Sequence, residues 1–122
     1  MQALTIVVFQ SDARIAQALA GVLSDHFTAV HVAENLRELH LTISRHRANV
    51  AILDIEGAQV AEVEHLHREF PGLSIVCTHR VADEEMWATV LNAGASDMCP
   101  TCDMEGIVVS AQRQGATTQA AA

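Results

Sequence analysis

Lysine and tyrosine are absent from this 122-residue sequence, and aromatic residues make up only 3% of it. The core must therefore be built from aliphatic side chains, which are abundant because 50% of the residues are hydrophobic. The basic residues are all arginine, seven against fifteen acids, and the net charge is −8 at pH 7. This balance argues against direct binding of nucleic acid, which requires a basic face.

Long hydrophobic runs are also missing. The run at residues 4–9 is far shorter than the roughly 20 residues that a membrane-spanning helix needs. The N-terminus lacks a basic stretch, an apolar segment and a cleavage site in succession, so we predict no secretion signal. Three cysteines are too few for a disulfide-stapled fold and are ordinary in a reducing compartment. We therefore expect a single acidic domain in the cytoplasm, without a membrane partner.

The sequence does contain a regular alternation of strand-like and helix-like segments. Continuous apolar runs rich in β-branched residues predict buried parallel strands, and apolar residues at helical spacing predict helices. The expected strands are residues 4–9, 28–32, 50–55, 73–78 and 96–99. The expected helices are residues 13–24, 36–47, 60–70, 83–92 and 104–112, with Asp12 and Asp103 as N-caps.

This alternation predicts an α/β fold of the flavodoxin-like, doubly wound type, with a five-stranded parallel sheet and about five helices. We expect the domain to cover residues 1–114. Residues 115–122 offer little to bury, so we expect a disordered tail or the start of a linker there. In such folds the functional crevice lies at the carboxyl ends of the strands.

The predicted crevice contains polar residues but no cofactor motif. Gln10, Ser11 and Asp12 follow the first strand, and residues 54–57, 78–79 and 99–102 follow later strands. No glycine-rich phosphate loop follows the first strand, and no paired aromatic residues are present to hold a flavin. We therefore expect no enzymatic activity, no cofactor and no metal site.

Three segments resemble landmarks of a known family. Residues 51–55 (AILDI) are similar to a strand that ends in a phosphorylated aspartate, and residues 70–76 (FPGLSIV) to the junction before the fourth strand. Residues 93–97 (AGASD) are similar to the turn into the fifth strand. In this order and spacing they resemble the receiver domain of bacterial response regulators, the phospho-acceptor module of two-component signalling, over residues 4–112. The resemblance implies that Asp54 is the phospho-acceptor.

The same resemblance implies acids that the sequence lacks. Receiver domains hold Mg²⁺ with two acids after the first strand, and this ion neutralises charge during phosphoryl transfer. Gln10 and Ser11 fall at these positions, and an amide and a hydroxyl are poor substitutes for carboxylates. Asp12 could serve only if the loop register slipped by one or two residues. The loop after Asp54 is also shorter than is usual in the family and lacks its proline.

Two further groups of the family are displaced or absent. A lysine after the fifth strand pairs with the aspartyl phosphate in receiver domains, and here Thr101 or Cys102 falls at its place. For the switch hydroxyl after the fourth strand, gapless counting gives His79, whereas a one-residue bulge would restore Thr78. Each missing charged partner could cost a few kcal/mol in a partly desolvated crevice.

These departures predict a degenerate receiver, or pseudo-receiver, that acts as a regulatory module by protein–protein contact. Asp54 is then a retained carboxylate that caps a helix start or accepts N–H bonds from a loop. The alternative is a receiver that is phosphorylated at Asp54 with Mg²⁺ in an unusual ligand shell. In either case an output domain could follow residue 122.

The fourth predicted helix is more apolar than one buried stripe requires. Receiver domains commonly dimerise or dock partners through the fourth helix, fifth strand and fifth helix, so the resemblance implies an interface there. The candidate interface residues are Met86, Trp87, Val90, Met104 and Val108. We expect Met86 and Val90 to form an exposed ridge, whereas Trp87 and Leu91 could instead pack in the core.

Cysteine and histidine raise one more hypothesis. Cys99 and Cys102 have the spacing of a redox or metal half-site, although Cys99 is also expected to pack as a small hydrophobe. His79 and Cys102 could approach each other at adjacent strand ends and form a metal or thiol switch. His65 and His67 lie on different faces of their predicted helix and form no chelating pair. The histidines expected at the solvated surface are these two with His26, His31, His40 and His46.

Overall fold

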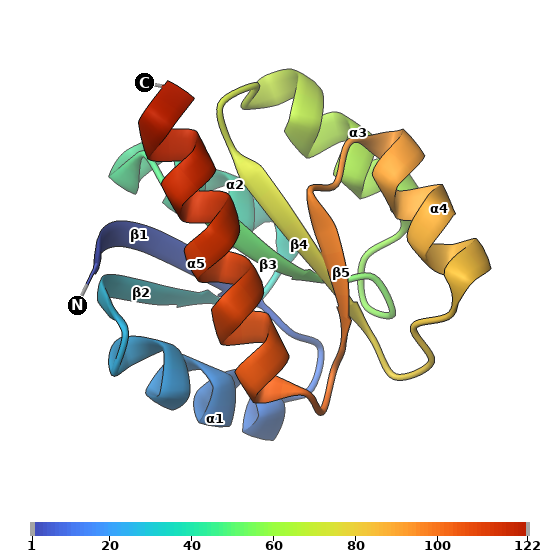
Figure 1. Ribbon diagram of the computed structural model, residues 1–122, viewed down its shortest axis with the longest axis horizontal. Coiled ribbons are helices and arrows are strands. Elements are labelled where there is room, and N and C mark those ends of the chain that lie inside the picture. The colour runs from blue at the N-terminus through green and yellow to red at the C-terminus, as the bar shows by residue number, and fades with distance from the viewer. Residues whose placement is uncertain (1, 122) are drawn as a thin grey trace.

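The computed structural model describes residues 2–121, with side chains for residues 2–115. Five strands and five helices alternate along the chain (Figure 1). The strands are β1 (Gln2–Phe9), β2 (Phe27–Ala33), β3 (Val50–Asp54), β4 (Ser74–His79) and β5 (Asp97–Pro100). The helices are α1 (Ala13–Ser24), α2 (Leu36–His46), α3 (Val60–Glu69), α4 (Glu84–Ala93) and α5 (Met104–Ala121). The predicted alternation is confirmed, and only the end of α5 lies far from its predicted place.

The strands form one parallel sheet in the order β2-β1-β3-β4-β5. Helices α1 and α5 cover one face of the sheet, and α2, α3 and α4 cover the other (Figure 1). Alternating strand residues supply the two cores, so Ile6 and Val8 pack on the α1/α5 side and Val7 on the opposite side. This is the predicted flavodoxin-like, doubly wound fold. Its strand order changes direction between β1 and β3, which places the crevice at their carboxyl ends.

Local sequence determines where the helices beside the crevice begin. Asp12 is the N-cap of α1, and its Oδ1 accepts N–H bonds from Arg14 and Ile15 at 2.9 and 3.4 Å. Asp103 accepts the backbone N–H of Gly106 at 3.0 Å in the first turn of α5. Both predicted N-caps are confirmed, because a short carboxylate side chain satisfies amide groups that the helix leaves without a partner.

Helix α5 is longer than predicted. The sequence predicts an end at residue 112, whereas the backbone stays helical to Ala121. Ala111 is buried, and a Cβ on Gly115 would overlap Leu4, so this helix packs tightly on the sheet beyond its predicted end. The side chains of residues 116–122 lie outside the described residues, and a linker that begins at residue 115 stays a prediction. None of the helices in the described part of the chain is long and apolar enough to cross a bilayer.

Candidate functional site

The carboxyl ends of β1, β3 and β4 bring four of the predicted crevice residues together. In the parallel register, Asp54 of β3 stands directly beside Thr78 of β4. Gln10 and Ser11 follow β1, which is the other neighbour of β3, and their side chains reach Thr78 and Asp54 respectively. The structure thus gathers these four residues at one edge of the sheet, where the sequence places the crevice.

Asp54 lies within this group and is only 1% exposed. Its Oδ2 accepts two hydrogen bonds from Ser11, from the backbone N–H at 3.1 Å and from the hydroxyl at 2.5 Å. Its Oδ1 accepts the backbone N–H of Glu56 at 2.9 Å, and its backbone carbonyl accepts the N–H of Ala58 at 2.9 Å. The carboxylate therefore joins the β1–α1 loop to the β3–α3 loop. This arrangement agrees with the structural role expected for Asp54.

The β3–α3 loop closes over this carboxylate at Gly57. A Cβ on Gly57 would lie 2.9 Å from the Cβ of Ser11 and 3.4 Å from Oδ2 of Asp54. Any side chain at this position would therefore push Ser11 away from Asp54. Gly57 thus lies close to the hydrogen-bonded pair of Ser11 and Asp54.

Gln10 replaces one of the acids that the resemblance implies. Its Nε2 donates to Oγ1 of Thr78 at 2.9 Å, and both side chains are buried. The pairing of Asp54 with Thr78 also distinguishes the two switch candidates, because His79 lies one residue further along β4 and pairs with Pro100. Thr78 therefore stands beside Asp54, but its hydroxyl already accepts a hydrogen bond from Gln10.

Asp12 and His79 are engaged elsewhere. The carboxylate of Asp12 caps α1, so the register slip that would bring it to Asp54 does not occur. The Nδ1 atom of His79 accepts the backbone N–H of Val81 at 2.9 Å, and its Nε2 lies 3.6 Å from Glu56 Oε1. Neither side chain contributes charge directly at the Asp54 carboxylate.

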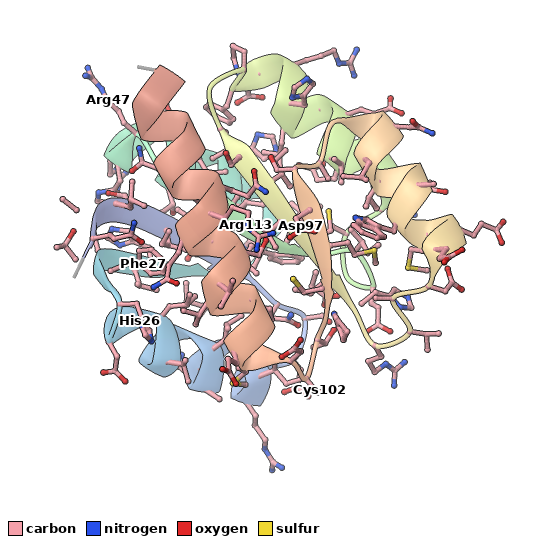
Figure 2. All side chains as sticks on the ribbon, viewed as in Figure 1. His26, Phe27, Arg47, Asp97, Cys102 and Arg113 are labelled. Atoms are coloured by element: carbon pink, nitrogen blue, oxygen red, sulfur yellow. The ribbon has the colours of Figure 1, made fainter. Side chains whose placement is uncertain are left out.

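No cation pairs with Asp54 within the described residues. The exposed Arg80 donates from its Nε to Oε1 of Glu56 at 2.8 Å. Thr101, at the place of the family's lysine, is buried and its hydroxyl has no hydrogen-bond partner. Cys102 is exposed in the loop after β5 (Figure 2). The lysine charge that the resemblance implies is therefore missing, although Arg80, which follows β4 and pairs with Glu56, also interacts electrostatically with Asp54.

The residues present do not fit the Mg²⁺ ion that a receiver fold implies. Mg²⁺ requires octahedral oxygen coordination, usually with one or two carboxylates and several waters. Oδ2 of Asp54 accepts two hydrogen bonds and Oδ1 accepts one, so the carboxylate offers a cation little more than the remaining lone pair of Oδ1. Asp12, the acid nearest in sequence to β1, is committed to capping α1. The site is built to hold Asp54 in place rather than to bind Mg²⁺ beside it.

The cysteines do not form a reactive pair. Burial, and secondarily the neighbouring Asp97, raises the pKa of Cys99 to about 11, and burial raises the pKa of Cys77 to about 12. Both therefore remain neutral thiols at physiological pH, and Cys99 packs as the expected small hydrophobe. Among the described residues, no group of three potential ligand atoms includes a cysteine or His79. The hypothesis of a metal or thiol switch at His79 and Cys102 finds no support.

The exposed face of α4 differs from the predicted one. Val90 and Val108 are buried, at 0% and 5% exposure, and Met86 and Met104 are partly buried against the two cores. Val90 and Val108 therefore cannot form an exposed ridge, and this part of the interface prediction is wrong. Helix α4 faces the sheet through Val90 and Ala93. Its opposite face exposes the remaining large apolar residues, Trp87 at 48% and Leu91 at 40%.

A cluster of histidines and glutamates was missed from the sequence. His40 of α2 contacts Glu62 and Glu69 of α3, and His65 contacts Glu69 as well. The prediction of a solvated surface position is therefore wrong for His40, which is half-buried. The spacing of Glu62, His65 and Glu69 along one helix face is a signal that sequence alone provides. That His40 joins this cluster could be recognised only from the structure, in which α2 packs beside α3.

Comparisons with known proteins support the fold. No family model matches the chain, and no curated protein is similar to it in sequence. NtrX from Brucella abortus, solved in complex with ADP, has a TM-score of 0.87 and 21% identity, over 97% of this chain and 27% of that one. A CheY-like response regulator receiver domain protein from Methanospirillum hungatei has a TM-score of 0.85 and 18% identity, over 99% of this chain and 100% of that one.

A response regulator from Thermotoga maritima is similar to the same degree, with a TM-score of 0.84 and 17% identity, over 94% of this chain and 99% of that one. The chain therefore has the fold of response-regulator receiver domains. It spans the whole length of the two single-domain proteins but only about a quarter of NtrX.

Proposed function

We propose that this protein is a regulatory module of the two-component type, a pseudo-receiver that acts by protein–protein contact and has no Mg²⁺-dependent phosphotransfer or other catalytic activity. The fold that it shares with response-regulator receiver domains supports this class. One observation carries the proposal. Asp54 is buried, and Ser11 and Glu56 donate hydrogen bonds to both of its carboxylate oxygens.

Phosphorylation of Asp54 would require a free carboxylate oxygen that attacks in line, with cations to neutralise the charge that develops. Here Oδ2 would first have to give up a hydrogen bond from Ser11, and Oδ1 would have to attack with the lone pair that does not accept from Glu56. Hydrogen bonds to a charged group are each worth about 1.5–3 kcal/mol. The reaction rate falls about tenfold for roughly every 1.4 kcal/mol added to the activation free energy. Because the chain has no lysine and the exposed Arg80 pairs directly with Glu56, the developing charge would be compensated only weakly, by the electrostatic attraction of Arg80.

We further propose that a protein partner, or a second copy of the chain, binds at α4. Trp87 and Leu91 lie one helical turn apart, are exposed, and are of the apolar type that anchors interfaces. The resemblance implies an interface in this region, and the exposed side chains there support it. In NtrX the similar part is only 27% of the chain, which supports a role beside an output domain. The net charge of −8 supports no direct nucleic-acid contact, and the free cysteines support action in the cytoplasm.

The direct test is incubation of the purified chain with a small phosphodonor, such as acetyl phosphate, and Mg²⁺. Intact-mass spectrometry should detect no added phosphoryl group on the wild-type protein. A receiver that is known to be phosphorylated under the same conditions serves as the positive control. A mass gain of one phosphoryl group that disappears in Asp54→Asn would contradict the proposal.

The second candidate function is an atypical receiver that is phosphorylated at Asp54. One observation favours it, because Thr78 stands beside Asp54 in the sheet register, as a switch hydroxyl would. In that case Thr78 would donate its hydroxyl proton to the phosphoryl group while its Oγ1 continues to accept the hydrogen bond from Gln10. The same phosphodonor experiment separates the two candidates.

A further inference from the structure

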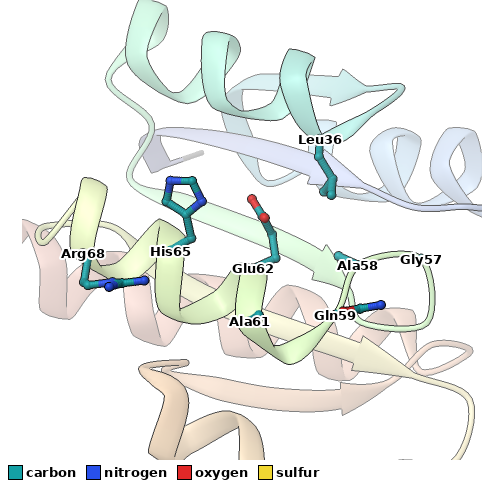
Figure 3. Close-up of a pocket in the computed structure, with 8 residues that line it drawn as sticks. All are labelled: Leu36, Gly57, Ala58, Gln59, Ala61, Glu62, His65 and Arg68. Atoms are coloured by element: carbon teal, nitrogen blue, oxygen red, sulfur yellow. The ribbon is translucent and has the colours of Figure 1, made fainter.

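Helices α2 and α3 bring two histidines and two glutamates together on the surface, and none of the four belongs to the Asp54 site. His40 comes from α2, and Glu62, His65 and Glu69 come from α3. The three α3 residues recur at three- and four-residue spacing, so they share the helix face beside α2. Figure 3 shows Glu62 and His65 projecting from α3 into an open groove of about 480 Å³, whose far wall is Leu36 of α2.

Three of these side chains already stand at the separations that a metal ion requires. Glu69 Oε2 lies 3.1 Å from His65 Nε2 and 3.2 Å from His40 Nδ1. All three ligand atoms lie within 4.8 Å of one another. In a tetrahedral site with metal–ligand bonds of about 2.0–2.1 Å, neighbouring ligand atoms are about 3.3 Å apart. Two edges of such a tetrahedron are therefore present, and the third, between the two ring nitrogens, is at most 4.8 Å long.

Metal-binding histidines characteristically donate the N–H of their other ring nitrogen to a carboxylate, and Glu62 provides that carboxylate for His40. It contacts Nε2 of His40, the ring nitrogen on the opposite side from Glu69. A proton held on Nε2 by this carboxylate leaves the Nδ1 lone pair directed toward Glu69 and His65. Such carboxylate–histidine pairs orient the ring and increase its basicity as a ligand. Packing beside Phe70, with ring centroids 6.1 Å apart, further restrains His40.

The arrangement of the two imidazole rings also favours a cation between them. Their centroids are 4.9 Å apart, and a divalent ion between them would compensate the charges of Glu62 and Glu69. Two nitrogen donors and a carboxylate suit Zn²⁺, Ni²⁺ or Cu²⁺, whereas Mg²⁺ and Ca²⁺ prefer oxygen donors only.

We propose that His40, His65 and Glu69 bind one divalent transition-metal ion, most simply Zn²⁺, with Glu62 as the positioning residue for His40. Three protein ligands leave one coordination position for water or for a donor that enters the groove. The ion would bridge α2 and α3 and stabilise the folded chain by mass action. This site is separate from Asp54 and does not depend on the proposed function.

The test is a zinc titration of the full chain, prepared without a histidine tag and stripped of metal with a chelator. Isothermal titration calorimetry should give one Zn²⁺ per chain, and Co²⁺ should produce the visible absorption of a tetrahedral site. His65→Ala and Glu69→Gln should each weaken binding at least about tenfold, and Glu62→Gln by about 10- to 100-fold. His65 and Glu69 are exposed, so their replacement should leave the fold intact, as circular dichroism would verify.

The matched control is His26→Asn, which removes an exposed histidine in the turn between α1 and β2 (Figure 2). It should bind Zn²⁺ as the wild type does. Affinities that are equal in wild type, His65→Ala and Glu69→Gln would identify adventitious surface binding and overturn the proposal. The absence of binding up to about 1 mM Zn²⁺ would overturn it as well. Neither result would bear on phosphorylation at Asp54.

Discussion

At the residue scale, Ser11 determines how the negative charge of the Asp54 carboxylate is compensated. An acid at this position would place two like charges together, and a cation would then be required to hold both. Serine instead offers a hydroxyl and a backbone N–H, which both donate to Oδ2 of Asp54. The buried charge is thereby compensated by hydrogen bonds alone. The proposed pseudo-receiver role rests on this exchange of an acid for a hydrogen-bond donor.

Replacing Asp54 by asparagine should therefore destabilise the protein by about 1–3 kcal/mol, because an amide cannot accept on both sides. Its NH₂ group would face the donors of Ser11 or of Glu56 and leave at least one of them buried without a partner. Urea unfolding followed by circular dichroism measures the change. Asp12→Asn is the control, since asparagine caps a helix as well as aspartate does. Equal stability of wild type and Asp54→Asn would contradict the structural role of Asp54.

His31 should make folding sensitive to mild acid. Partial burial, and then the His46 ring stacked on it with centroids 4.0 Å apart, lowers the pKa of His31. The unfolded chain, with a histidine pKa of about 6.5, then binds more protons than the folded one as the pH falls through this value. Between about pH 7.5 and pH 5.5, His31 should lower the free energy of unfolding as the pH falls, whereas His40, whose pKa is raised on balance because its burial is outweighed by Glu62 and Glu69, acts in the opposite direction. His31→Gln should therefore make the protein lose less stability in acid than the wild type. Equal slopes in the wild type and His31→Gln would contradict the assignment.

At the element scale, α4 packs on the sheet with one face and exposes apolar side chains on another. Val90→Ala should destabilise the protein by about 2 kcal/mol, because it removes two buried methyl groups. Trp87→Ala should change the free energy of unfolding by less than about 0.5 kcal/mol while it weakens association with a partner or second copy. Urea unfolding and analytical ultracentrifugation measure the two effects. A large stability loss in Trp87→Ala would mean that the tryptophan belongs to the core.

The same helix shows why the order of elements is easier to predict than the face that an element buries. Strands and helices follow from hydrophobic periodicity, which is local, and all ten elements were predicted in order. In α4, however, the neighbouring apolar residues Met86, Trp87, Val90 and Leu91 cover more than one side of the helix. Two faces are then compatible with the pattern. Packing against the sheet selects the one that contains Val90 and Ala93.

At the scale of the whole molecule, the sites depend on contacts between residues far apart in sequence. The convergence of Gln10, Asp54 and Thr78 could be predicted, because parallel strands end at one edge of the sheet. The bond from Ser11 to Asp54 spans 43 positions, and its donors could not be read from a pattern. The pairing of His40 with Glu62 likewise needs α2 and α3 to lie together. Sequence thus predicted where the crevice lies but not the hydrogen bonds that hold Asp54 within it.

The acidic composition should also govern stability as a property of the whole chain. With fifteen acids, seven arginines and a net charge of −8, the folded state is under like-charge repulsion. The Debye length falls from about 30 Å at 0.01 M salt to about 8 Å at 0.15 M, so salt screens most of this repulsion. It also weakens exposed pairs such as Arg80–Glu56, but each of these contributes only about 0–1 kcal/mol. We therefore expect sodium chloride over this range to raise the melting temperature by roughly 2–5 °C, equivalent to about 1 kcal/mol.

Thermal unfolding with a chelator present, which removes divalent ions, measures this shift, and tetramethylammonium chloride should reproduce it if screening is the cause. A melting temperature that falls with salt would mean that attractive pairs outweigh the net charge.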